Sequence, residues 1–204
     1  MINLFGSRKN KKILILQGHP DTSPNRFCNV IASVYNKGAI SKGHLSEVIN
    51  ISHLTFSLLK SKIEHEQGPI PLDIELVQKK IISADHLVII YPLWLGEMPA
   101  LLKAFLEQVM RPNFAYDLNK KGNLAKKLIG KSARVIITMG MPALFYRIPI
   151  IGYGAHSLKS LKKGILHFVG IKPVRTTLIG MIESKSKNFE KQLLKIEKLG
   201  KKAI

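Results

Sequence analysis

The chain has 204 residues, of which 46% are hydrophobic, and its formal net charge is +19. This length suits one α/β domain with a substantial core, and no apolar run reaches the ~18 residues that a membrane span needs. We expect a single domain over residues 1–204 with a basic arm over residues 1–11. Because the first residues lack the pattern of a secretory signal, we expect a cytoplasmic protein.

Five short runs rich in β-branched and aliphatic residues predict strands, at residues 13–17, 45–51, 86–91, 133–138 and 174–179. Segments with helical spacing of apolar residues alternate with them, at residues 25–37, 73–83, 99–110, 157–169 and 187–202. This alternation predicts crossover units around a parallel sheet. We therefore expect a doubly wound α/β domain of the flavodoxin-like type, with strand order 2-1-3-4-5 and a ligand at the carboxyl ends of the strands.

The first candidate segment, residues 18–26, follows the first predicted strand. Thr22 or Ser23 is expected to cap the next helix, whose N-terminus would form an anion site. Their hydroxyls, with Asn25 and Arg26, could complete a phosphate cradle. A capped helix without a ligand explains the same residues equally well.

The second candidate segment is residues 92–98, after the third predicted strand. Pro92 stiffens the turn. Backbone groups of Leu93, Trp94 and Leu95 could hydrogen-bond the edge of a flat ring while their side chains cover its face. The alternatives are a capping hydrophobic cluster or a dimer contact.

The third candidate segment, Thr138-Met139-Gly140-Met141, follows the fourth predicted strand. Gly140 permits a close approach of the backbone to a ligand, and successive N–H groups could face an electron-rich ring edge. Tyr146 could donate a hydrogen bond from its phenol, although it could equally be a half-buried structural tyrosine. In a doubly wound domain the three segments converge at one edge of the sheet, which predicts a flavin site.

Several other functions find little support. The histidines show no metal-ligand spacing, and Cys28 is alone in a predicted helix, where a buried inert thiol is expected. The lysine excess attracts phosphates, but no base-reading motif accompanies it, so we expect no specific nucleic-acid partner. Solvated lysines are the simplest explanation of the charge. Peripheral contact with an anionic membrane or a membrane protein is the alternative.

Three stretches carry a family resemblance: residues 91–105 continuing to 112–116, residues 18–25, and residues 163–171. Together they resemble the flavodoxin-like NAD(P)H:quinone oxidoreductases, a family that includes quinone reductases and bacterial modulators of drug activity. The resemblance implies a homodimer that binds FMN or FAD. It also implies ping-pong transfer of a hydride from NAD(P)H through flavin N5 to a quinone-type acceptor.

By position, the resemblance implies three groups of cofactor-binding residues and one catalytic residue. His19, Ser23 and Asn25 would hold the phosphate region, residues 92–95 the isoalloxazine and residues 138–141 its pyrimidine edge, while Tyr146 would contact the flavin edge and the acceptor. The sequence departs from the family at Gly152, where relatives have a histidine, at Pro24, where many have an aromatic residue, and at Met141, where many have glycine.

Three alternative functions stay open. The chain could reduce flavins, azo compounds or nitro compounds, because the acceptor pocket of such enzymes is permissive. It could be a regulatory subunit of a membrane transport protein, as some relatives are. Charge alone would favour nucleic-acid binding. For the homodimer we expect helix 99–110 or the aromatic residues 114–116 near the interface.

Overall fold

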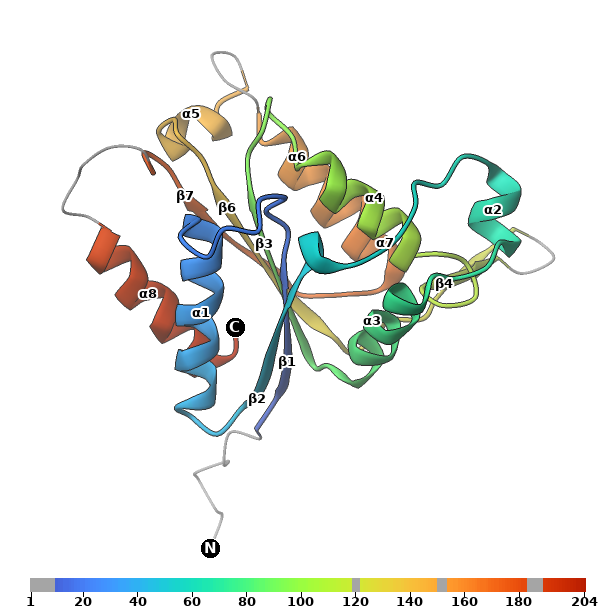
Figure 1. Ribbon diagram of the computed structural model, residues 1–204, viewed down its shortest axis with the longest axis horizontal. Coiled ribbons are helices and arrows are strands. Elements are labelled where there is room, and N and C mark those ends of the chain that lie inside the picture. Colours follow the sequence, from blue (N-terminus) through green and yellow to red (C-terminus); the bar gives the residue numbers. More distant parts are fainter. Residues whose placement is uncertain (1–9, 119–121, 150–153, 183–188) are drawn as a thin grey trace, which may run out of the picture.

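A five-stranded parallel sheet forms the centre of the computed structural model, which describes residues 10–118, 122–149, 154–182 and 189–204 (Figure 1). Its strands are β1 (Lys12–Gln17), β2 (Leu45–Asn50), β3 (His86–Pro92), β6 (Ser132–Thr138) and β7 (Val174–Ile179). The predicted α/β class and parallel sheet are confirmed. The order is β2-β1-β3-β6-β7, not literally 2-1-3-4-5, because β4 (Tyr116–Leu118) and β5 (Leu124–Lys126) intervene in the chain and pair with each other, antiparallel, outside the main sheet.

Helices cover both faces of the sheet (Figure 1). One face packs against α1 (Phe27–Ile40) and α8 (Phe189–Lys202). The other packs against α3 (Leu72–Ser83), α4 (Ala100–Val109) and a composite helix built from α6 (His156–Lys159), η2 (Ser160–Leu166) and α7 (His167–Val169). The remaining short helices are η1 (Ile51–His53), α2 (Lys62–Gln67) and α5 (Ala143–Arg147). Within the described ranges, no helix is both long and apolar enough to cross a membrane.

Strand β3 shows how the sequence dictates this layering, since every residue from His86 to Pro92 is buried. Leu87, Ile89 and Tyr91 point into the core beneath α3 and α4. Val88 and Ile90 point into the core beneath α1 and α8. A strand buried on both faces needs an almost continuous apolar run, and this is why the pattern of residues 86–91 identified it.

Two glycines set the packing of α8 on α1. A Cβ at Gly38 would collide with the carbonyl of Glu197, and a Cβ at Gly200 would collide with the carbonyl of Tyr35. Only glycine lets the two helix backbones approach this closely. The contact places the N-terminal turn of α8 beside that of α1, where the rings of Phe27 and Phe189 lie 5.2 Å apart.

Two helix predictions need correction. Helix α1 begins at Phe27 rather than at residue 25, its N-cap is Arg26, and no side chain caps it, so the expected capping by Thr22 or Ser23 is wrong. A turn closed by the Arg26 N–H and the Ser23 carbonyl separates those hydroxyls from the first helical N–H groups. The predicted helix 157–169 is interrupted by the π-helical segment η2.

Candidate functional site

A cavity of ≈ 400 Å³ opens at the carboxyl ends of β1, β3 and β6. The loops that follow β1, β3 and β7, the end of β6 and the first turn of α1 all contribute to its walls. Its lining residues are His19, Asp21, Asn25, Arg26, Phe27, Cys28, Trp94, Thr138 and Ile182. Parallel strands bring their carboxyl ends to one edge, so the predicted convergence of these segments has its physical cause in the topology.

The loop of residues 18–26 is held by its own polar side chains. The His19 N–H donates to Gln17 Oε1 at 2.6 Å, and the Asp21 N–H donates to His19 Nδ1 at 3.0 Å. Asp21 in turn accepts the Ser23 N–H at 2.8 Å and the Arg26 Nε at 2.6 Å. Because the loop satisfies these groups internally, its shape is fixed before any ligand arrives.

Two main-chain donors remain at the start of α1. In the part of the chain that the structure describes, the N–H groups of Phe27 and Cys28 have no recorded acceptor, and both residues line the cavity. Free N–H groups and the positive end of the helix dipole form an anion site. The site is thus built from main chain and from Asn25 and Arg26, while Thr22 lines a neighbouring cavity and Ser23 is half-buried in the turn.

The charges beside this anion site are balanced. Asp21 and Arg26 form an ion pair, and the Ser23 N–H and the Arg26 guanidinium hold the pKa of Asp21 below its usual value. Partial burial lowers the pKa of His19, Asp21 opposes this shift and Arg26 adds to it. The imidazole is then neutral near pH 7, with Nδ1 as acceptor and Nε2 as donor.

The loop after β3 presents apolar side chains outward. Trp94 is 47% exposed and Leu95 103% exposed, both large values for such residues. A tight turn joins Trp94 and Glu97 through two hydrogen bonds of 2.9 Å and places Leu95 and Gly96 at φ values of 49° and 81°. Leucine in the left-handed region costs conformational energy, so the turn holds this side chain outward at a price in stability.

Trp94 faces the first loop. Its ring lies edge-on to that of His19, with centroids 5.6 Å apart and an interplanar angle of 82°. The N–H groups of Leu93 and Trp94 do not point into the cavity, because they donate to the carbonyls of Thr138 and Glu97. These two N–H groups are thus engaged within the protein, whereas the Leu95 and Gly96 N–H groups have no recorded acceptor among the described residues.

The loop after β6 begins directly after Thr138, which lines the cavity. Met139 is buried, its N–H donates to Ile179 at 2.9 Å, and its carbonyl accepts from Ile182 at 3.3 Å, so Met139 is not a free donor. Gly140 is exposed and does not have a positive φ. In the described ranges the N–H groups of Gly140 and Met141 have no recorded partner.

Cys28 closes the floor of the cavity. Its Sγ lies 3.3 Å from Thr138 Oγ1, and burial raises the pKa of the thiol to about 11. A thiol so protonated is not a nucleophile, in agreement with the expected inert role. Among residues 10–118, 122–149, 154–182 and 189–204, no group of three His, Cys, Asp or Glu side chains could hold a metal ion.

Tyr146 lies outside the cavity wall. It is fully buried, its hydroxyl accepts the Leu158 N–H at 2.9 Å, and burial raises the pKa of the phenol. The neighbouring Tyr91 hydroxyl pairs with Ser157 Oγ at 3.1 Å. Both tyrosines thus support the start of α6. Gly152 lies outside the described residues, and His156 is exposed at the first turn of α6.

Sequence reasoning missed the supports of the site. Gln17 is 1% exposed at the end of β1, orients the His19 N–H and contacts Asn29 through its amide. Asn29 donates to the Ser23 carbonyl at 2.7 Å. A glutamine that ends an otherwise aliphatic strand is the signal that could have revealed this network.

Comparison with known proteins gives an independent view of the chain. A family model described as "Flavodoxin-like fold" matches residues 11–199. An uncharacterized NAD(P)H oxidoreductase of Haemophilus influenzae is 28% identical over 172 residues, which are 83% of each chain. The human ribosyldihydronicotinamide dehydrogenase [quinone] is 33% identical over 110 residues, 53% of this chain and 47% of the human protein, so the match spans about half of that relative.

A solved structure is similar to this chain in fold and in sequence. The NAD(P)H:quinone oxidoreductase from Methanothermobacter marburgensis has a TM-score of 0.78 at 25% identity, with 94% of this chain and 98% of the other covered. The family resemblance inferred from residues 91–105, 18–25 and 163–171 is confirmed at the level of the family.

Proposed function

Because the chain belongs to the flavodoxin-like fold family, we propose that it is a flavin-dependent NAD(P)H oxidoreductase acting on a quinone-type acceptor. One observation carries the assignment. At the carboxyl ends of the same strands stand a main-chain anion site at α1, an exposed apolar platform at Trp94 and Leu95, and the N–H groups of Gly140 and Met141, which have no recorded partner among the described residues. These match the three parts of a flavin: its phosphate, its ring face and its pyrimidine edge.

The residues present fit such a cofactor. The Phe27 and Cys28 N–H groups, with Asn25, Arg26 and His19 Nε2, would hold the phosphate. We assign Thr22 and Ser23 to the outer rim of the same loop. A flavin supplies hydride chemistry when bound, and the protein's part is to bind, orient and exclude water.

The ring would lie between the second and third loops. Pro92 and Leu93 form the base of the platform, Trp94 and Leu95 cover a ring face, and residues 138–141 border its pyrimidine edge. N–H groups aimed at that edge stabilise negative charge there, and fixed donors need no rearrangement when charge develops. Placement on one apolar face favours a flat acceptor such as a quinone.

The catalytic role proposed for Tyr146 is narrower than the resemblance implied. Its hydroxyl is buried against Leu158, so it would act on the acceptor step by positioning the start of α6 rather than by donating to the acceptor.

We leave FMN and FAD as the two candidate cofactors. A cavity of ≈ 590 Å³ adjoins the phosphate loop and is lined in part by Thr22, Asn50 and His53. This cavity offers room for the nucleotide half of FAD. With FMN bound, water would fill it instead. The reductant is NADH or NADPH, and we propose a cytoplasmic site of action for one domain over residues 1–204.

The test begins with cofactor content. Purified protein, reconstituted with FMN and separately with FAD, should release one equivalent of flavin per chain on denaturation. The loaded protein should then oxidise NADPH or NADH in a ping-pong pattern with a quinone. Failure to bind either flavin would refute the assignment. Binding without reduction by either nicotinamide would favour the regulatory function, and faster turnover with azo or nitro compounds would change the acceptor class.

We also propose a homodimer. The outer face of α4 and strand β4 border a cavity of ≈ 340 Å³, whose walls include Tyr116 and Phe168. Phe168 is 39% exposed and Tyr116 is half-buried, so a second copy would cover these apolar groups. Sedimentation at micromolar concentration should give twice the 22.8 kDa chain mass, and a Phe168→Glu variant should shift it toward the monomer. A monomer for the parent protein would contradict the proposal.

A further inference from the structure

The amino ends of the strands form a second distinctive surface, opposite the candidate site. We define the basal surface by nine exposed residues at this end: Lys12, Lys42, Lys172, Lys198, Lys202, Ile40, Leu45, Ile82 and Ile129. Lys12 pairs in register with Leu45, Ile13 with His86, and His86 with Ser132, so the strands start side by side. At about 4.8 Å per strand spacing, this row is about 20 Å wide.

Carboxylates at this end of the sheet bind groups other than the amines of the basal lysines. Glu47 pairs with Lys80, Glu197 pairs with Lys201 at 2.6 Å, and Asp85 accepts the main-chain N–H of Lys12 at 2.8 Å. Within the described residues, none of the five basal lysines forms an ion pair.

Helix capping does not explain these lysines either. The helices α1, α3 and α8 end at this side, where cations stabilise the helix dipole. Two other lysines do so: Lys11 donates to the Ala203 carbonyl at 3.0 Å, and Lys131 donates to the Ile82 and Ala84 carbonyls at 2.6 and 2.8 Å. No such bond is recorded for the side chains of the five basal lysines in the part of the chain that the structure describes.

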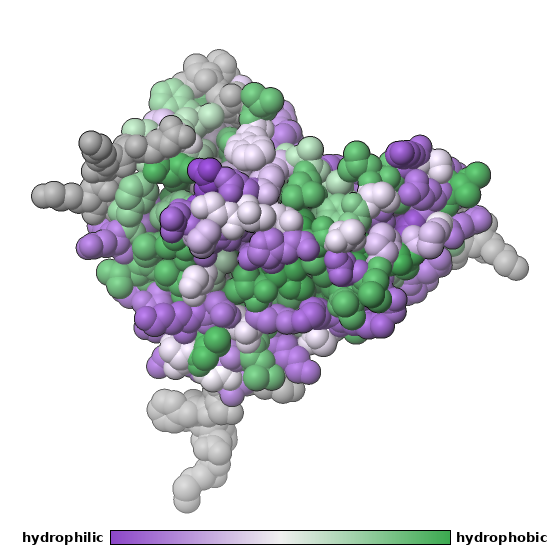
Figure 2. Space-filling view, in the orientation of Figure 1, coloured by the Kyte–Doolittle hydropathy of each residue, from purple (hydrophilic) through white to green (hydrophobic). Residues whose placement is uncertain are grey.

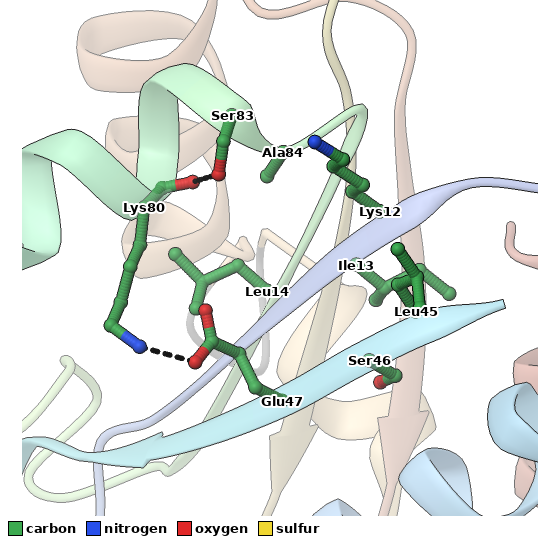
Figure 3. Close-up of a pocket in the computed structure, with 9 residues that line it drawn as sticks. All are labelled: Lys12, Ile13, Leu14, Leu45, Ser46, Glu47, Lys80, Ser83 and Ala84. Carbon is green, nitrogen blue, oxygen red and sulfur yellow. Dashed lines mark hydrogen bonds and ion pairs between the residues drawn. The ribbon is translucent and has the colours of Figure 1, made fainter.

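Two hollows interrupt the surface. One, of ≈ 410 Å³, is lined by Asn10, Lys42, His44, Lys198, Lys201 and Lys202. The other, of ≈ 250 Å³, includes Lys12 and Leu45 (Figure 3). Figure 3 shows Lys80 bound to Glu47, while the Lys12 amine has no such contact. The first hollow could admit an anionic headgroup between ammonium groups.

Large aliphatic side chains accompany the lysines. Ile40, Leu45, Ile82 and Ile129 are 54%, 65%, 62% and 71% exposed. Hydrophobic and hydrophilic residues mix at the lower end of the molecule in Figure 2. A phosphodiester backbone gains nothing from aliphatic groups, whereas a bilayer accepts them at its interface while its headgroups bind the lysines.

We propose that the basal surface docks the protein on an anionic lipid bilayer. The lysines supply charge complementarity, and the aliphatic tips enter the interfacial region. The candidate flavin site then faces away from the bilayer, toward water, because it lies at the opposite ends of the same strands. This docking does not depend on flavin binding or on the identity of the acceptor.

Vesicle flotation tests the proposal with matched charge changes. The basal variant carries Lys42→Glu, Lys198→Glu and Lys202→Glu. The control carries Lys60→Glu, Lys159→Glu and Lys191→Glu, all exposed lysines nearer the carboxyl ends of the strands. Both variants lose the same net charge. Each lysine near an anionic surface changes partition on the order of fivefold, so the basal variant should lose on the order of 100-fold and the control only a few-fold.

The probe is phosphatidylcholine vesicles with and without phosphatidylglycerol. Parent protein should float only with the anionic vesicles, and added salt should weaken the binding. A Leu45→Ser, Ile82→Ser double variant should bind less tightly than a matched Ile63→Ser, Leu144→Ser variant, most visibly at raised salt.

Equal losses in the two lysine variants would overturn the proposal, because binding would then follow net charge alone. Absence of binding to anionic vesicles would overturn it as well. So would displacement of the protein from vesicles by duplex DNA, if the aliphatic substitutions also had no effect on vesicle binding. Flavin content measured on the same samples reports separately on the proposed function, since neither variant alters the cavity.

Discussion

The two ends of the sheet use the same five strands for opposite purposes. At the carboxyl ends, the loops that follow β1, β3 and β6 satisfy most of their polar groups internally and expose aromatic and aliphatic side chains around a cavity. At the amino ends, the corresponding connections are short, and lysines without an ion pair among the described residues stand among isolated aliphatic groups. At the carboxyl ends, main-chain groups in fixed positions suit a ligand of defined shape. At the amino ends, dispersed positive charge suits a membrane surface, which has no defined shape.

This difference teaches where specificity can reside. A fixed donor such as the Gly140 N–H selects a ligand by the position of its acceptor atom. A small side chain placed between the donor and the ligand should therefore abolish this hydrogen bond. A basal lysine contributes by charge, so its loss should be graded and salt-dependent. Changes at one end should accordingly leave the other end's binding intact.

The largest expected effect comes from Gly140→Val. Gly140 is exposed two residues after Thr138, which lines the cavity, and has no positive φ, so valine fits the backbone but places a branched side chain where the ring edge should approach. Flavin affinity should fall on the order of 100-fold, about 2.7 kcal/mol, with vesicle binding unchanged. A Gly164→Val control, at a position where a Cβ meets nothing within 4 Å, should keep parent affinity. Equal affinities for Gly140→Val and the parent would separate this turn from the cofactor.

A second expected effect concerns the apolar platform. Trp94→Ala removes a ring that is 47% exposed and lies edge-on to His19, so stability should change little. Loss of a stacking surface should weaken flavin binding by about 10-fold, or about 1.4 kcal/mol. Leu194→Ala is the control, because Leu194 is a large apolar side chain on α8, 57% exposed, that does not line the candidate cavity. A similar loss of affinity in both variants would remove Trp94 from the site.

The sequence predicted the strands and loops around the candidate site better than it predicted which N–H groups there remain unpaired. The strands were identifiable because burial on both faces requires runs such as that of β3. The loops were placed correctly because topology brings strand ends together. Which N–H groups remain free depends on pairings between distant segments, such as Leu93 with Thr138 and Met139 with Ile179, and no local pattern reports these.

Other features escaped for different reasons. Helix α2 carries a local signal that could have been used, since Ser61 accepts the Glu64 N–H at 3.1 Å in a Ser-x-x-Glu capping pattern. The orientation of Tyr146 carried no such signal. Its burial depends on packing against α6, and a tyrosine pattern reads the same whether its hydroxyl faces a ligand or Leu158.

A smaller effect is expected for Tyr146→Phe. The change removes one hydrogen bond to the Leu158 N–H, worth about 1 kcal/mol, and little packing. Flavin affinity should stay unchanged and reoxidation of reduced flavin by a quinone should slow by about fivefold in stopped-flow measurements. Tyr91→Phe should slow this step similarly, because its hydroxyl pairs with the adjacent Ser157 and supports the same start of α6. Unchanged rates in Tyr146→Phe would exclude Tyr146 from function.

The subtlest expectation is the titration of His19, which reports directly on the carboxyl-end cavity. Burial lowers the pKa of His19, the Asp21 carboxylate raises it and Arg26 lowers it. Protonation at Nδ1 would also break the hydrogen bond from the Asp21 N–H. The imidazole is therefore neutral in the folded protein at a pH where it already takes up a proton in the unfolded chain. As pH falls through about 6.5 the unfolded chain binds the proton first, so this group makes folding less stable toward acid and contributes fully only above that pH.

Two variants should move this midpoint in opposite directions. Asp21→Asn keeps an oxygen for the Ser23 N–H but removes the attraction, so the pKa of His19 should fall further. Arg26→Gln removes the repulsion, so the pKa should rise. Histidine resonances followed by NMR from pH 4 to 8 measure both, and an anion such as FMN phosphate at the start of α1 should raise the pKa in the parent protein. A parent midpoint above about 6.5 would contradict the lowered pKa of His19, and no response to FMN would place the phosphate away from this loop.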